Sequence, residues 1–154
     1  MNELLNFIRE GQAFIIPALV LIITQIVKVA LEWPKTKSIR FSDFSQYGGM
    51  PSSHTALFVS LGTIIFLTAG WHSPVFAVSV IICIIMVRDA LGIRHHLGNH
   101  GKILKQVIEE QAKFHNCRIK HEKLVTRLGH TPLQVMVGAL VGFFLTVLFY
   151  LILN

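Results

Sequence analysis

Four long apolar runs constrain this chain more than any other feature of its sequence. They cover about residues 13–32, 52–70, 73–91 and 132–153. A helix that crosses a bilayer needs roughly 17–25 mostly apolar residues, and each run reaches that length. Charged residues make up only 14% of the 154 residues, against roughly 25% in an ordinary soluble domain. The sequence therefore predicts an all-α, polytopic membrane helix bundle with about four transmembrane helices in a single domain, residues 1–154.

The basic residues predict how this bundle is oriented. Two loops, about residues 33–50 and 88–130, carry most of the lysine and arginine, whereas the turn at 71–73 has no formal charge. With four spans, both basic loops lie on one side of the membrane and both termini on the other. Because cytoplasmic loops are enriched in lysine and arginine, we expect a multi-pass protein of the cell membrane with extracytoplasmic termini and cytoplasmic basic loops.

The longer basic loop contains a helical pattern. Apolar residues recur in it at helical spacing, namely Ile103, Leu104, Val107, Ile108 and Ala112. This pattern predicts one or two amphipathic helices within about 101–126, as part of a cytosolic insert at about 95–129. The insert could lie on the membrane surface, cap a site, or form a charged helix in solvent. The apolar pattern alone does not distinguish these three arrangements.

The charge balance indicates the chemistry of the partners. The formal charge is +6 and the pI about 9.7. Because the positive residues flank apolar spans, anionic membrane lipids and phosphorylated substrates are the expected partners. No nucleic-acid-binding motif is present, so nucleic acid is not an expected partner.

Two histidines precede or open apolar runs that follow the basic loops. His54 follows Gly48, Gly49 and the serines Ser52 and Ser53, which we expect to cap a helix. His130 precedes Thr131 and Pro132, an expected N-cap and first helical residue. Helix N-termini attract anions, and histidine exchanges protons near neutral pH. If both sites meet, they form an anion pocket; taken singly, each is an ordinary helix start with an interfacial histidine.

Three further ionisable residues lie at the ends of apolar runs. Asp89 and Arg94 close the third run, and Lys28 is late in the first. An acid near the apolar zone requires a partner, and the guanidinium of Arg94 can hold phosphate in a bidentate manner. Lys28 either extends to the interface or points into the site.

Three motifs together resemble those of the divergent PAP2 family, which is related to type 2 phosphatidic acid phosphatases and vanadium haloperoxidases. They are Gly-Gly-Met-Pro-Ser-Ser-His at 48–54, Asp-Ala-x-Gly-x-Arg at 89–94 and Leu-Gly-His-Thr-Pro-Leu-Gln-Val at 128–135. The resemblance extends from Gln25 to Gly138. It implies a metal-independent lipid phosphatase without a cofactor.

The resemblance also implies roles for individual residues. His130 would attack phosphorus and form a phosphohistidine, while His54 would protonate the leaving group. Lys28 and Arg94 would bind the phosphate, together with Arg40 or Lys37. Ser52 and Ser53 would contribute to the same phosphate site.

The chain departs from the family's pattern at Gln134. The position four residues after the nucleophile should carry an acid that orients the imidazole. A glutamine can hold the ring through its carbonyl oxygen but cannot stabilise an imidazolium by charge. Asp89 is the residue that would compensate. Arg94 and His100 have the superfamily's arginine-to-histidine spacing, but His130 alone has the downstream Pro-x-x-Val-x-x-Gly pattern.

Alternatives to the phosphatase follow from the same residues. One is a non-catalytic lipid-phosphate binder or carrier, which Gln134 supports. Another is a small membrane assembly subunit whose basic loop binds a cytosolic partner. A metal site on His96 and His100 is not expected, because Gly98 and Asn99 should interrupt their helix and no acidic or thiolate ligand is placed with them. A homodimer is compatible with so thin a bundle, but no small-xxx-small motif decides it.

Overall fold

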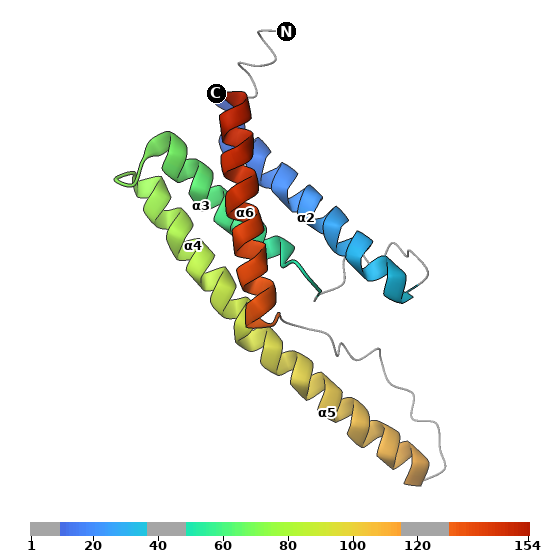
Figure 1. Ribbon diagram of the computed structural model, residues 1–154. Coiled ribbons are helices and arrows are strands. Elements are labelled where there is room, and N and C mark those ends of the chain that lie inside the picture. Colours follow the sequence, from blue (N-terminus) through green and yellow to red (C-terminus); the bar gives the residue numbers. More distant parts are fainter. Residues whose placement is uncertain (1–9, 37–48, 115–129) are drawn as a thin grey trace.

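The computed structural model describes residues 10–36, 49–114 and 130–154, and these residues are mainly helical (Figure 1). The helices are α2 (Gln12–Thr36), α3 (Ser53–Ala69), α4 (Pro74–Leu91), α5 (Ile93–Phe114) and α6 (Pro132–Leu153). No strand occurs within the described residues. The predicted all-α membrane helix bundle is therefore confirmed.

Helix α3 is the centre of the bundle, because it packs against α2, α4 and α6. Figure 1 shows that α2 and α4 run in one direction and α3 and α6 in the other. At one end, the side-chain amide Nδ2 of Asn154 donates a hydrogen bond to Oε1 of Gln12 at 3.3 Å, so α6 ends where α2 begins. The starts of α3 and α6 and the end of α4 consequently meet at the opposite end.

Three of the described helices are long and apolar enough to cross a membrane: Gln12–Leu31 within α2, the continuous α4–α5 segment Pro74–Phe114, and Pro132–Leu153. Helix α3 is also apolar but has 17 residues, the lower end of the range that spans a bilayer. The chain thus contains the apolar helices of a membrane protein, and the fourth crossing remains a prediction.

The turn between α3 and α4 is tight, because only residues 70–73 separate the two helices. Gly70 ends α3 with a φ of 76°, in the left-handed region that glycine adopts without strain. The Ser73 hydroxyl accepts a hydrogen bond from the Val75 amide at 3.3 Å, and Pro74 occupies the first helical position. The turn brings α4 back along α3 and closes the end of the bundle opposite the two histidine motifs.

The amphipathic helix of the insert differs from the prediction. Helix α5 begins at Ile93, separated from α4 by Gly92 alone, rather than near residue 101. Gly98 and Asn99 lie inside α5 and do not interrupt it, so that expectation was wrong. A single glycine costs a helix only about 1 kcal/mol, which the flanking helical residues offset. Figure 1 shows α5 extending α4 beyond the rest of the bundle. The remainder of the insert, 115–129, is outside the described residues.

Candidate active site

Helices α3 and α6 approach each other closely at two glycines of α6. A Cβ atom added to Gly138 would lie 2.5 Å from the Ser52 carbonyl oxygen, and one added to Gly142 would lie 2.5 Å from that of Ala56. Any other residue would therefore force the helices apart. Small residues at four-residue spacing permit this kind of contact between membrane helices. The α6 glycines hold its first turns directly against the start of α3.

Hydrogen bonds reinforce the same contact. The Ser52 amide donates to the Gln134 carbonyl oxygen at 3.2 Å, which links the start of α3 to the first turn of α6. Two turns further along α3, the Thr146 hydroxyl donates to Oγ of Ser60 at 2.6 Å, and both residues are fully buried. We refer to the pairs Ser52–Gly138, Ala56–Gly142 and Ser60–Thr146 as the α3–α6 seam.

His54 is in the first turn of α3, two residues after Ser52. Ser52 and Ser53 are buried and His54 is exposed. Ser52 is the N-cap residue, but its hydroxyl bonds to Oγ1 of Thr55 at 2.9 Å and makes no cap to a backbone amide. The predicted serine cap was therefore wrong in its bonding, although the position is right. An α-helix leaves its first backbone N–H groups without intrahelical acceptors, so this helix start is suited to an anion.

His130 lies at the start of α6 and is tied to α4. Its amide donates to the Ala90 carbonyl oxygen at 3.2 Å, so the residue beside Asp89 holds the backbone of His130. Nδ1 of His130 is shielded from solvent. The starts of α3 and α6 and the end of α4 are thus linked by two backbone hydrogen bonds at a single end of the bundle.

Thr131 and Gln134 form a capping box at the start of α6. The Gln134 amide donates to the Thr131 hydroxyl at 3.4 Å, and the Thr131 amide donates to Oε1 of Gln134 at 2.9 Å. Pro132 is in the first turn. The predicted Thr131 cap is confirmed. The Gln134 side chain, expected to orient the His130 ring, bonds to the backbone of α6 in this structure.

Lys28, a candidate phosphate ligand, is a buried cation within a helix that is long and apolar enough to span a membrane. It is 4% exposed and follows the buried residues Ile16, Val20 and Thr24 at four-residue spacing. This series turns from apolar to polar along α2. Because α2 and α3 run in opposite directions (Figure 1), Lys28 lies toward the end where α3 begins. A buried ionisable residue inside a membrane helix is costly and usually functional.

The remaining candidates are only partly described. Asp89 is half-buried near the end of α4. Arg94 is in the first turn of α5, just after the end of α4, and its side chain lies outside the described part of the structure. Arg40 and Lys37 lie outside the described residues.

Two histidines that sequence analysis considered as metal ligands, His96 and His100, lie on α5. His96 and His100 are exposed and one helical turn apart. Within residues 10–36, 49–114 and 130–154, no group of three or more histidine, cysteine, aspartate or glutamate side chains is placed to hold a metal ion.

Sequence reasoning missed the seam glycines, and its statement that no small-xxx-small motif bears on helix packing was wrong. Gly138 and Gly142 form a Gly-x-x-x-Gly motif, which was a readable signal for close helix packing. The motif alone does not show whether the helix that packs against these glycines belongs to the same chain. In the structure its partner is α3.

Taken together, these features define a small helical membrane protein in which two helix starts, each with a histidine close in sequence, are linked by a backbone hydrogen bond, with a buried lysine toward the same end of the bundle. The chain belongs to the divergent PAP2 family, whose model matches residues 9–145. It is similar to the uncharacterized membrane protein YuiD of Bacillus subtilis (strain 168), at 34% identity over 135 residues, which cover 82% of this chain and 85% of that protein. No solved structure matches the chain.

Proposed function

We propose that this protein is a membrane lipid phosphatase that hydrolyses a phosphate monoester or diphosphate of a lipid through a phosphohistidine. The observation that carries the proposal is the junction of the two histidine-bearing helix starts. The Ser52 amide bonds to the Gln134 carbonyl oxygen, so residues two positions before His54 and four positions after His130 are in direct contact. Family membership supports the same activity.

The proposed reaction uses the two histidines in turn. Nε2 of His130 attacks phosphorus, the bond from phosphorus to the lipid oxygen breaks, and His54 donates its proton to that oxygen. Water then attacks the phosphohistidine, His54 accepts a proton from the water, and the phosphorus–nitrogen bond breaks to release phosphate. Each bond made to phosphorus is matched by one broken, and His54 regains the proton that it gave.

Positive charge would stabilise the transferring group. Phosphoryl transfer depends chiefly on positioning and on stabilisation of the equatorial oxygens. Lys28, Arg94 and Arg40, together with the partial positive charge of two helix N-termini, would supply it. Ser52 and Ser53 would help to place the first-turn amides of α3. The cytoplasmic location of this site, with both termini on the other side, is part of the proposal.

Replacing His130 by alanine tests the catalytic role. Phosphate release from phosphatidate, phosphatidylglycerophosphate or a prenyl diphosphate should fall by about 10³-fold or more, because the nucleophile is removed. His54→Ala should cost about 10²–10⁴-fold, the usual contribution of a general acid. The matched control is His72→Ala, a histidine in the turn between α3 and α4. Undiminished turnover in His130→Ala would exclude it as nucleophile.

A second candidate, a lipid-phosphate binder or carrier without efficient hydrolysis, is favoured by the bonding of Gln134. Its Oε1 accepts from the Thr131 amide, and no acid stands at this position. Gln134→Glu separates the two functions cleanly, because glutamate also completes a capping box. Hydrolysis gained by this variant over an inactive wild type would favour the binder. An assembly subunit would instead retain its function when both His54 and His130 are replaced.

A further inference from the structure

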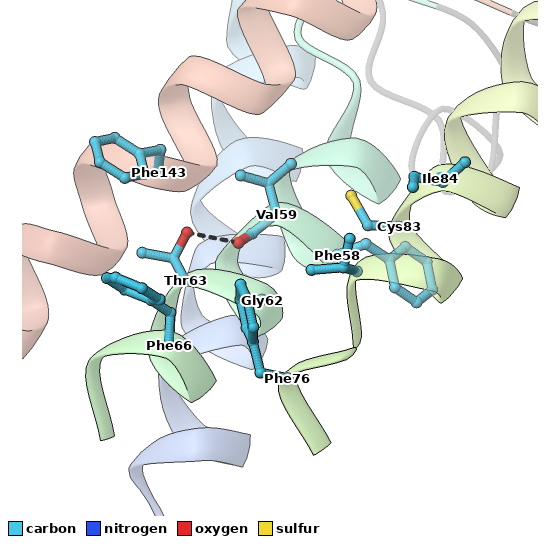
Figure 2. Close-up of a pocket in the computed structure, with 10 residues that line it drawn as sticks. Phe58, Val59, Gly62, Thr63, Phe66, Phe76, Cys83, Ile84 and Phe143 are labelled. Atoms are coloured by element: carbon cyan, nitrogen blue, oxygen red, sulfur yellow. Dashed lines mark hydrogen bonds between the residues drawn. The ribbon is translucent and has the colours of Figure 1, made fainter. Parts of the chain in front are cut away.

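A hollow lies on the side of α3 that faces α4. It has a volume of about 290 Å³ and is bounded by α3, α4 and α6 (Figure 2). We call it the α3–α4 groove. Phe58 and Gly62 line it from α3, Phe76 and Cys83 from α4, and Phe143 from α6.

The lining of the groove is suited to hydrocarbon. Phenylalanine rings from all three helices surround it, as Figure 2 shows. Thr63 contributes a hydroxyl, but this donates to the Val59 carbonyl oxygen of its own helix at 2.8 Å. A polar ligand would therefore lose its hydrogen bonds to water without replacement. An apolar chain would lose none.

The groove leads toward the candidate active site. His54 and Phe58 are four residues apart on α3, so their side chains are neighbours on the helix surface. Gly62 and Phe66 continue the same ridge, and both line the groove. At its far end the rings of Phe66 and Phe76 are in contact, with centroids 5.6 Å apart. The ridge from His54 to Phe66 is about 18 Å long at the helical rise per residue.

We propose that the α3–α4 groove holds one hydrocarbon chain of the phosphorylated lipid, with its phosphate beside His54. This inference rests on the proposed function and adds the substrate's apolar part to it. The volume of about 290 Å³ is at the low end of ligand pockets, roughly 300–1,000 Å³. It accommodates a single chain, and a second chain of the same lipid stays in the bilayer. Binding should therefore strengthen with chain length up to about 18 Å and then level off.

Cys83 provides a test that does not require hydrolysis. In nanodiscs, with Cys117→Ser to remove the other cysteine and His130→Ala to prevent turnover, alkylation of Cys83 by N-ethylmaleimide reports access to the groove. A long-chain alkyl phosphate should slow the alkylation several-fold, whereas inorganic phosphate and a short-chain alkyl phosphate should not. Equal rates with all three would overturn the proposal. Equal slowing by the corresponding long-chain alcohol would show that the phosphate plays no part in binding, which also contradicts it.

Filling the groove provides the second test. A Cβ atom at Gly62 would meet only Oγ of Ser79, at 3.8 Å, so the backbone accepts a side chain there. Gly62→Leu should raise KM for a long-chain substrate about tenfold, the effect of losing roughly two buried methylenes, and leave a short-chain substrate unchanged. The matched control is Ala77→Leu, at an exposed position of α4. An unchanged KM for the long-chain substrate in Gly62→Leu would contradict the proposal.

These measurements separate failure of the groove from failure of the proposed function. If the wild type hydrolyses lipid phosphates but neither chain length nor Gly62→Leu matters, the groove proposal fails alone. If no hydrolysis occurs but long-chain alkyl phosphate protects Cys83, the phosphatase fails and the groove proposal stands as a lipid-phosphate site.

Discussion

The two sides of α3 differ sharply in how they pack. Toward α6, the seam consists of small residues whose backbones touch, and a single added Cβ at Gly138 or Gly142 would collide with a carbonyl oxygen. Toward α4, large phenylalanine rings leave a hollow of about 290 Å³. The seam fixes the relative positions of two helix starts, whereas the groove leaves room for a ligand. One helix thus joins a rigid contact that can align catalytic groups to an open surface that can admit a substrate chain.

The largest difference in stability between the seam and the groove should come from substitutions of their glycines. Gly138→Ala places a methyl group 2.5 Å from the Ser52 carbonyl oxygen, and overpacking of this kind costs about 1–3 kcal/mol. Gly62→Ala meets no atom closer than 3.8 Å, and should be neutral or stabilising by about 0.5–1 kcal/mol because alanine favours helix. Thermal unfolding in detergent measures both. Equal stability of the two variants would show that the seam is not tightly packed.

Loss of the α6 cap should have a smaller effect at the same end of the seam. Thr131→Ala removes the hydroxyl that accepts from the Gln134 amide and should cost about 1 kcal/mol. Thr131→Ser keeps that hydroxyl and is the matched control. Unfolding in a denaturing detergent compares the two, and a Thr131→Ser variant as unstable as Thr131→Ala would argue against capping.

The hydrogen bond between Thr146 and Ser60 should contribute least. Thr146→Val keeps the shape and removes the 2.6 Å bond, and bonds of this kind between membrane helices average about 0.6 kcal/mol. The control is Thr68→Val, whose hydroxyl bonds to the Ile64 carbonyl oxygen within α3. If combining Thr146→Val with Ser60→Ala costs the sum of the two single changes, the residues are not coupled across the seam.

The sequence predicted the helices and the Thr131 cap because these depend on local patterns. Apolar runs longer than 17 residues and a Thr-Pro-x-Gln start are each typical of helix, whatever surrounds them. The start of α5 was misplaced because Gly98 and Asn99 are weak helix formers, and helical neighbours on both sides outweigh that preference.

The candidate site was predictable in composition but not in contacts. The histidines, Lys28 and the helix starts were found from residue types, since anion sites require them. Residue types did not predict the hydrogen bonds of Ser52 to Thr55 and of Gln134 to Thr131, because a hydroxyl or amide has several acceptors and donors within reach. The groove depends on which rings face which helix, and spacing in one helix does not supply that information.

A structure with orthovanadate bound, as a mimic of the transferring phosphoryl group, tests the central claim most directly. We predict vanadium at Nε2 of His130, with His54 beside the oxygen opposite to that nitrogen and Lys28 among the groups around the equatorial oxygens. Vanadate bound away from His130, or held by only one of the two helix starts, would contradict the account.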